Sequence, residues 1–574
     1  MQGPPNTTTL AVGFRDLNPT YKKSTIFPAV ICCKLSTINC QLSTINYQLS
    51  TINYANPIMR NPKVETVRGV NDVLTETYQI QQQIQNQLSS CFESFGYRPI
   101  DVPVIEYTEL FLRKSGEELI SRMYDFTYHN RRLCLRPELT ASVARAYVNN
   151  GALQGEPLPV RLFYCGPAFR YEKPQRGRYR QFTQMGIEAI GAGGTMADGE
   201  IIALACQSLD RLGLQDYELV MGNIAVLNQF LAAKPLENRL RNFLLANMEK
   251  LRNDGRQDLE KGLEEIYPTF SAEESGSTAR LKWLFKDLDP QEAHLTILEL
   301  LESMNVNLVG MRQPEEIAHR LLAKIEREDQ QSLIEDTLAF MEELAQLKGK
   351  PEEVLPAAEQ LLKSYEIYSK PLEQLKEILT LLESYRLDSS KIILDLGMSR
   401  GIQYYTGTIF EIHHDTLGQE RQLCGGGRYD DLVRTVGGNN DMSASGFSFG
   451  IERIRLAMES EGILPSVNSD GVHALIIPVS EAEWGYSIKV AEKLRHSGWQ
   501  VEMDVRGKNV TSNLKYAVKR DIPYVMVVGE RERLAGTVVV KNMATREQQE
   551  LSLDALSTLS PLSPNPSPRG RGAM

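Results

Sequence analysis

The segment from Phe163 to Glu188 constrains the fold more than any other part of the chain. It begins with alternating apolar residues, as half-buried strands do, and ends with a second strand carrying Phe182, Gln184 and Glu188 two and four residues apart. Side chains at even spacings share one sheet face, so these three should lie together. The loop between the two strands is cationic and contains Arg170, Lys173, Arg176, Arg178 and Arg180.

Such a hairpin can offer a basic loop to phosphates and a rigid floor to a small ligand. The alternative is a solvated, charged hairpin, which a run of charges alone favours. An arginine directly after the aromatic residue of the first strand, together with polar groups at sheet period in the second, favours binding.

The composition limits the class of protein. A chain of 574 residues implies several domains. Its net charge of -10 argues against general affinity for nucleic acid, so such a partner would have to meet local basic patches. No run of about 18 apolar residues predicts a membrane span. The 8 cysteines form no CxxC pairs, which predicts a reduced, cytoplasmic protein with neither a zinc site nor another tightly bound metal.

Both ends of the chain differ from the rest. Residues 35–54 repeat the heptapeptide LSTINxQ, whose Ser, Thr and Asn weaken a helix, and the tail is rich in Pro and Ser. We expect 1–58 and 554–574 to be disordered and the working chain to begin near Met59.

Two clusters follow in the body of the chain. In LRPELTA, Glu138 and Thr140 stand where a strand meets a helix, and ligand binding and helix capping are both open there. In SRGIQYYTGTIFE, Arg400 lies on a glycine-containing loop before a predicted strand, on which Tyr404 and Tyr405 face opposite sides.

Further positions are ambiguous from local pattern alone. The glycines of CGGGRYDDL allow close approach of a ligand or simply form a hairpin. Arg453, at the start of a helix, would make an anion site or lie exposed. Residues 226–388 are strongly helical and charged and show no chemistry, and Lys515 and Lys519 mark a basic helix face that is usually solvated.

Taken together, these segments resemble the histidyl-tRNA synthetases of class II, from about Val64 to Leu553. Three segments resemble the three class motifs, namely TVRGVNDVL through Pro103, FRYEKPQRGRYRQFTQMGIE and FGIERIRLAM. The segments LRPELTA, SRGIQYYTGTIFE and GGGRYDDL resemble those peculiar to the histidine enzymes.

The resemblance implies an α+β fold with an antiparallel catalytic sheet, flanking helices, a long helical insertion and a C-terminal α/β anticodon-binding domain. The implied division is a catalytic core at 59–225 and 389–465, the insertion at 226–388 and the anticodon-binding domain at 471–553. It also implies a homodimer.

The implied reaction joins histidine to ATP, with Mg²⁺ bridging the phosphates, and then moves the histidyl group to the 3′ end of tRNA(His). By similarity, Arg170 and Arg400 flank the α-phosphate. The other roles carried over are ATP binding by Glu172, Phe182 and Arg453, histidine binding by Glu138, Thr140, Gln184, Glu188, Tyr404 and Tyr405, and tRNA binding by Lys173, Arg176, Lys515 and Lys519.

The chain departs from the family pattern at three places. Gln403 stands where an aspartate is usual, Thr183 where many bacterial members have histidine, and Leu139 where glycine is common. The runner-up function is a non-catalytic paralogue of the type that regulates ATP phosphoribosyltransferase, which lacks the C-terminal domain. A synthetase-like RNA sensor is a second alternative.

Overall fold

The computed structural model describes residues 63–113, 117–266, 290–303, 333–398, 404–466 and 471–559. The predictions for the N-terminal repeat, for Met59, for Arg400 and Gln403, and for the tail beyond 559 lie outside the described residues. The predicted disorder is wrong for 554–559, where Ala555–Thr558 form a short 3-10 helix and Leu556 is buried in the core of the C-terminal unit.

The architecture is built on a nine-stranded sheet in the order β1-β5-β6-β12-β11-β10-β7-β9-β8. Neighbouring strands from β5 to β7 pair antiparallel, whereas the pairs β1/β5 and β7/β9 are parallel. The strands are β1 Arg98–Pro99, β5 Val160–Phe169, β6 Gln181–Ile190, β7 Glu218–Asn223, β8 Lys348–Gly349, β9 Ile392–Asp395, β10 Thr408–His413, β11 Gln422–Arg428 and β12 Ala444–Gly450. The predicted antiparallel catalytic sheet is therefore confirmed in its main part.

Period two along the strands separates the two faces of this sheet. Met185 and Ile187 of β6 join the larger core, which packs against helices α2 Thr75–Ser94, α7 Thr195–Arg211 and α18 Ile451–Glu461. The opposite face carries a second core, in which Tyr164 packs with residues of α5 Thr140–Asn149. Gln184 and Glu188 alternate with the first set, so they turn toward the α5 side.

The glycines of CGGGRYDDL lie within β11, in the interior of the sheet, so their interpretation as a hairpin is wrong. A Cβ on Gly426 would lie 2.5 Å from the Cβ of Phe447 and 2.5 Å from the carbonyl oxygen of Gly446. The close approach these glycines allow is thus, at Gly426, an approach of neighbouring strands.

A separate three-stranded sheet has the order β2-β4-β3, with β2 Ile105–Tyr107, β3 Tyr124–Tyr128 and β4 Arg131–Leu135. Its outer strands expose large apolar side chains, namely Ile105 (52%), Tyr107 (54%), Phe126 (41%) and Tyr128 (62%). The short helices nearby in the chain are α3 Glu109–Leu112, α4 Glu117–Ser121 and α6 Gly151–Gln154.

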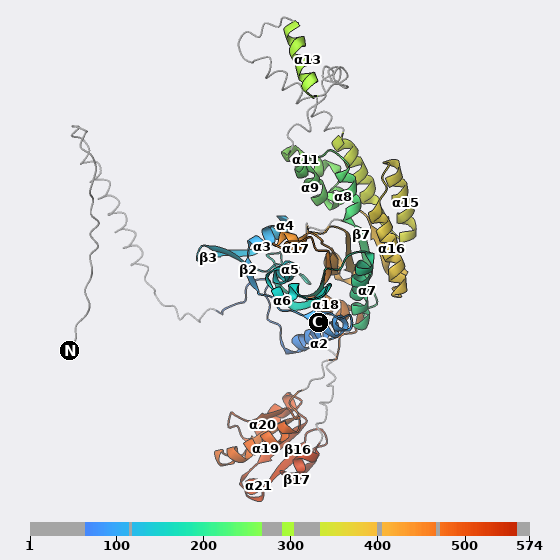
Figure 1. Ribbon diagram of the computed structural model, residues 1–574. Helices are drawn as coiled ribbons and strands as arrows, with labels where there is room; N and C mark the ends of the chain where they lie inside the picture. The colour runs from blue at the N-terminus through green and yellow to red at the C-terminus, as the bar shows by residue number, and fades with distance from the viewer. Residues whose placement is uncertain are drawn as a thin grey trace, which may run out of the picture. The chain divides into compact units, whose positions relative to one another are not determined.

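The predicted helical region is present in the described residues. Its helices are α8 Ile224–Ala232, α9 Asn238–Ala246, α10 Met248–Asp254, α11 Arg256–Ile266, α13 Pro290–Ser303, α15 Pro351–Ser364 and α16 Lys370–Ser384. Phe230 and Phe340 stack with ring centroids 3.7 Å apart and join segments on either side of the gaps in this region. Helix α16 packs along α7 of the sheet layer (Figure 1).

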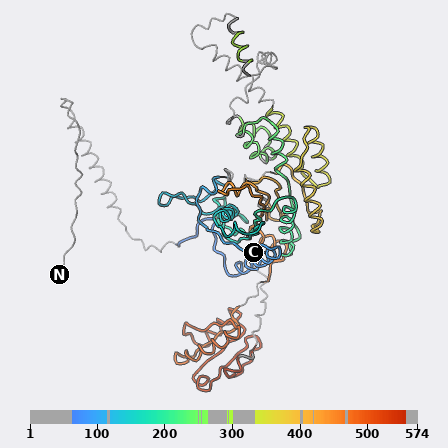
Figure 2. The backbone as a smooth tube through the Cα atoms, viewed as in Figure 1, coloured from blue at the N-terminus to red at the C-terminus, as the bar shows by residue number. Residues whose placement is uncertain are grey.

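Residues 471–559 form the small C-terminal α/β unit that the resemblance implies, drawn in orange to red in Figure 2. Its five-stranded mixed sheet has the order β14-β13-β15-β16-β17. The elements are β13 Ala474–Pro478, α19 Trp484–His496, β14 Val501–Met503, α20 Val510–Lys519, β15 Tyr524–Val528, α21 Glu530–Ala535, β16 Thr537–Asn542 and β17 Gln548–Ser552. Among the described helices of the chain, none combines the length and apolar character needed to cross a membrane.

Candidate active site

A cavity of about 560 Å³ opens on the α5 side of the nine-stranded sheet. Its wall combines the β5–β6 hairpin with β10, β11, β12 and the start of α18, so segments about 250 residues apart in sequence meet there. It is lined by each ATP- and histidine-binding residue of our prediction that the structure describes: Glu138, Thr140, Arg170, Glu172, Phe182, Gln184, Glu188, Tyr404, Tyr405 and Arg453. The even-spaced residues of β6 do share one face.

Glu188 is a buried polar group of the cavity wall and is 1% exposed. The Tyr164 hydroxyl donates to Glu188 Oε1 at 3.1 Å, and the Tyr429 hydroxyl donates to Oε2. A Cβ on Gly446, directly across on β12, would lie 2.0 Å from Glu188 Oε2, so only glycine leaves room for this carboxyl group. The pKa of Glu188 is raised to about 8, because burial, together with the nearby charge of Glu138, outweighs the hydrogen bonds from Tyr429, Thr140 and Tyr164 that lower it.

Tyr164 and Tyr429 were missed as site residues in the sequence. Tyr164 lies at an even spacing from Phe182 and Glu188, in the partner strand of the same hairpin, which is a signal that could have found it. Tyr429 follows the glycine run by two residues, and nothing local indicates that β11 and β12 bring it to β6.

Glu138 lies at the N-terminus of α5, where its carboxylate accepts the backbone N–H groups of Thr140 at 2.5 Å and Ala141 at 2.9 Å. The alternative to ligand binding was Thr140 as the helix cap and Glu138 as a carboxylate of the first turn. Both placements are wrong, because Leu139 holds the cap position and Glu138 precedes it, although the Glu138 carboxylate does accept N–H groups of the first turn. Gln184 bridges the same helix start to β12: its Oε1 accepts from Leu139 N at 3.2 Å, and its Nε2 donates to Ser448 Oγ at 2.7 Å. Glu138 thus both accepts N–H groups at the start of α5 and lines the cavity.

Tyr404 and Tyr405 lie on the same cavity, which corrects the expectation that they face opposite sides. Strand β10 begins only at Thr408, so the alternation of a strand does not apply to these two residues. Their ring centroids are 4.8 Å apart, and the Tyr404 ring meets Tyr429 edge-on at 5.6 Å. The rings of Tyr404, Tyr405 and Tyr429 thus line one cavity together with Glu188.

Arg170 lines the cavity beside the start of α5. Its Nε donates to the carbonyl oxygen of Pro137 at 2.9 Å, and its guanidinium lies 5.3 Å from the centroid of the Phe182 ring. Burial lowers the pKa of Arg170, while Glu172 and Glu138 raise it. The group keeps its charge at neutral pH, because arginine titrates far above 7.

Arg453 and Glu172 also line the cavity. Arg453, on the first turn of α18, donates to the carbonyl oxygens of Gly177 at 2.8 Å and Gln422 at 2.9 Å. Glu172 accepts from Arg178 Nε and, at 3.3 Å, from Arg122 Nη1. Burial raises the pKa of Glu172, but these arginines and Arg170 outweigh it and lower the pKa overall.

The four residues assigned to tRNA do not line the cavity. Lys173 and Arg176 are exposed on the hairpin loop, where Arg176 lies 3.7 Å from Glu459, and Lys515 and Lys519 are exposed on α20. The helical region, in contrast, does contribute to the wall. Arg252 of α10 bonds both carboxylate oxygens of buried Asp395 at 2.7 and 2.6 Å, a contact that helical periodicity alone could not predict.

Within the described residues, no group of three or more His, Cys, Asp or Glu side chains could hold a metal ion. Mg²⁺ bound to a nucleotide needs less, since phosphate oxygens and water supply most of its ligands. Carboxylates on the wall include Glu411 of β10 and Glu452 of α18, and this donor set fits such a shared ion.

The chain matches two protein-family profiles. The profile described as histidyl-tRNA synthetase matches residues 69–305 and 311–454, and the one described as anticodon binding domain matches residues 473–559. The first includes the whole described cavity.

Among curated relatives, the histidine--tRNA ligase of Pyrococcus furiosus is 32% identical over 493 residues, 86% of this chain and 97% of that protein. Among solved structures, a histidyl-tRNA synthetase from Nostoc sp. PCC 7120 shares the fold with a TM-score of 0.54 and 19% identity, over 86% of this chain and 98% of that one. A Bacillus halodurans structure, titled an ATP phosphoribosyltransferase regulatory subunit/histidyl-tRNA synthetase, matches with a TM-score of 0.54 and 22% identity, over 83% and 99%. At these identities the two structures show the fold alone. The two profiles and the archaeal relative together show that the chain belongs to the histidyl-tRNA synthetase family.

Proposed function

We propose that this protein activates histidine with ATP, giving histidyl-adenylate and pyrophosphate, and then transfers the histidyl group to the 3′ end of tRNA(His). The observation that carries the proposal is one cavity whose wall combines the buried carboxyl groups of Glu138 and Glu188 with the guanidinium groups of Arg170 and Arg453. A zwitterionic amino acid and a nucleotide triphosphate present the matching charges.

The histidine end suits an imidazole ring. Neutral imidazole has one N–H donor and one nitrogen acceptor, so it needs a partner of each kind. Glu188 faces the ring from β6, and Tyr404 and Tyr405 are the polar aromatic residues beside it. A side chain lacking these nitrogens would leave the buried polar groups unsatisfied, which is how such a site discriminates strongly. Glu138, Thr140 and Gln184 would receive the α-amino group.

The phosphate end suits an in-line displacement. The histidine carboxylate attacks the α-phosphorus, and negative charge grows on the phosphate oxygens before pyrophosphate leaves. Arg170 would stabilise that charge by bidentate hydrogen bonds, with Arg400 on the other side of the phosphate. Phe182 would stack below the adenine, Arg453 would cover it and hold the γ-phosphate, and Glu172 would contact the nucleotide. Glu411 and Glu452 would help to hold a Mg²⁺ ion, which would neutralise phosphate charge.

The remaining partners follow from this activity. Residues 473–559, which match an anticodon-binding profile, would hold tRNA through Lys515 and Lys519, and the hairpin loop would do so through Lys173 and Arg176. We also propose the predicted domain division, with a catalytic core at 59–225 and 389–465, the insertion at 226–388 and the anticodon-binding domain at 471–553. We expect a cytoplasmic location, because aminoacylated tRNA is used in translation. A non-catalytic regulatory role is less well supported, since the resemblance gives such paralogues no C-terminal domain.

The first prediction concerns the activation half-reaction. Purified protein should exchange pyrophosphate into ATP with histidine and with none of the other nineteen amino acids, because only an imidazole satisfies both ends of the pocket. The assay is ATP–pyrophosphate exchange with each amino acid in turn. Histidine binding without exchange would overturn the proposal in favour of the regulatory role.

The second prediction concerns the arginines. Arg170→Ala and Arg400→Ala should each lower kcat by about 10²–10³-fold, on the order of 2–4 kcal/mol of transition-state stabilisation, with histidine affinity largely kept. Exchange kinetics measure the first quantity and calorimetry the second. Arg98→Ala is the control, because Arg98 is an exposed arginine paired with Glu156. An unchanged kcat in either variant would remove that arginine from the site.

The third prediction concerns Glu188 and pH. Its pKa is about 8 in the folded protein against an ordinary value of 4.5, so the folded state holds a proton that the unfolded chain releases. The contribution of Glu188 to the free energy of unfolding should therefore be fully present below about pH 4.5 and be lost as the pH rises through about 8. Relative to Glu188→Gln, the unmodified protein should lose on the order of 3–5 kcal/mol between pH 5 and pH 8.5 in urea unfolding of the catalytic core. Parallel pH profiles would contradict the raised pKa.

The fourth prediction concerns assembly. The apolar side chains exposed on β2 and β3 form a surface that association would cover, and we propose that a second copy of the chain covers it. Light scattering should give twice the chain mass of 64.7 kDa. Paired Tyr107→Asp and Phe126→Asp substitutions should shift the protein toward one chain, and a single-chain mass for the unmodified protein would refute the dimer.

A further inference from the structure

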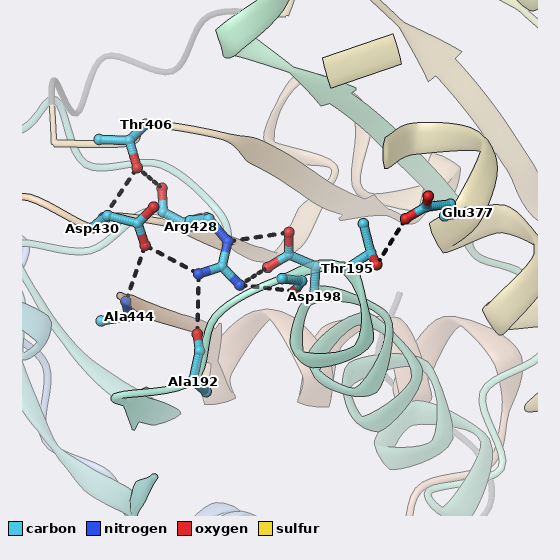
Figure 3. Close-up of polar contacts among 9 residues, drawn as sticks. Ala192, Thr195, Asp198, Glu377, Thr406, Arg428, Asp430 and Ala444 are labelled. Carbon is cyan, nitrogen blue, oxygen red and sulfur yellow. Dashed lines mark hydrogen bonds and ion pairs between the residues drawn. The ribbon is translucent and has the colours of Figure 1, made fainter. Parts of the chain in front are cut away.

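Arg428, the last residue of β11, makes a buried polar network that the proposed reaction does not use (Figure 3). Its guanidinium donates to Asp198 Oδ2 at 3.2 Å and Oδ1 at 2.6 Å, to Asp430 Oδ1 at 3.0 Å, and to the carbonyl oxygens of Ala192 at 3.0 Å and Gly194 at 3.1 Å. A guanidinium has five N–H groups, so the donors of Arg428 are fully used. These five hydrogen bonds together hold the Arg428 side chain in one position.

This ion pair joins segments that lie far apart in sequence. Asp198 stands in the first turn of α7, and Ala192 and Gly194 precede that helix. Arg428 and Asp198 are 8% and 7% exposed, so both charges are largely removed from water. A buried pair of this kind adds little net stability compared with apolar packing, but it admits few alternative arrangements. Its consequence is the fixed position of β11 relative to the start of α7.

The same network continues into the backbone beside the cavity. Thr406 N donates to the carbonyl oxygen of Arg428 at 2.8 Å, and Thr406 Oγ1 accepts from Asp430 N at 3.0 Å. Asp430 in turn accepts from Ala444 N at 3.2 Å, which ties the turn to β12. The segment carrying Tyr405 is thus held next to the turn that follows β11.

Two cavity residues are direct neighbours of this network in the chain. Tyr429, which donates to Glu188, lies between Arg428 and Asp430, and its own N–H donates to the carbonyl oxygen of Ala444 at 2.8 Å. Tyr405 directly precedes Thr406. The positions of both aromatic side chains therefore follow from where the network places their backbone.

We propose that Arg428, paired with Asp198 and Asp430, is a positioning residue for recognition of the histidine ring. It touches no substrate in this assignment, and acts by setting Tyr429 against Glu188 and by holding the segment of Tyr404 and Tyr405 through Thr406. The inference rests on the proposed function and adds a specificity determinant outside the cavity wall.

The geometry separates this role from a general structural one. Arg428 ends β11, whereas Arg453, at the nucleotide end, bonds the carbonyl oxygen of Gln422, the first residue of that strand. A disturbance at Arg428 should therefore weaken histidine binding much more than ATP binding. Loss of folding would weaken both equally.

Arg428→Lys keeps the charge but cannot pair with Asp198 through two parallel bonds and also reach both carbonyl oxygens. We expect the KM for histidine in ATP–pyrophosphate exchange to rise roughly 10- to 100-fold, with the KM for ATP within about twofold of the unmodified value. Calorimetric titration with histidine alone should show the same loss of affinity.

A second pair of variants keeps the test decisive if Arg428→Lys fails to fold. Thr406→Val is isosteric but removes the acceptor of the Asp430 N–H, whereas Thr406→Ser keeps it. Valine should raise the KM for histidine by about 3- to 10-fold, and serine should restore it. Glu377→Ala is the control: Thr195 donates to Glu377 at 3.0 Å at the same helix start, on an exposed surface that does not reach Arg428.

The outcomes distinguish this inference from the proposed function. If the unmodified protein neither binds histidine nor exchanges pyrophosphate, both fall. If it does so and the folded Arg428→Lys and Thr406→Val variants keep the histidine KM, the positioning role alone is overturned. An equal rise in the KM for histidine and for ATP, or the same change in Glu377→Ala, would also overturn it.

Discussion

The burial of one carboxyl group organises the site. Glu188 lies in the interior of a sheet at 1% exposure, where an unpartnered carboxyl would cost several kcal/mol. Its oxygens are satisfied by hydroxyls from β5 and from the turn after β11, and β12 leaves space for it by having glycine at position 446. Four separate segments must be in register before these conditions hold. The pocket is therefore a property of the completed sheet and of no single motif.

Much of this could be predicted where the information is local. The period of two in β6 placed Phe182, Gln184 and Glu188 on one face, and the structure agrees, because alternation follows from backbone geometry. The C-terminal α/β domain that the resemblance implies is likewise present, as the elements from β13 to β17.

The errors have two physical causes, namely the position at which a strand begins and contacts between distant segments. Tyr404 and Tyr405 were assigned to opposite faces by extending strand alternation into a stretch that precedes β10. Tyr429 reaches the cavity because β11 pairs with β12, and Arg252 does so because it bonds Asp395 at the end of β9, and neither contact leaves a trace in the spacing of nearby residues. Such contacts depend on register and layer packing, which a single sequence does not encode locally.

Glu138 and Arg170, both on the cavity wall, shift each other's pKa. Arg170 lowers the pKa of Glu138, which burial raises, and Glu138 in turn raises the pKa of Arg170, which burial lowers. Each group thus favours the charged form of the other within a site of reduced dielectric. In the proposed function, an amino acid lying between them would place its ammonium group at Glu138 and its carboxylate near Arg170. That orientation would direct the carboxylate toward the arginines proposed to bind phosphate, so this pair of charges would set the orientation in which the proposed substrate reacts.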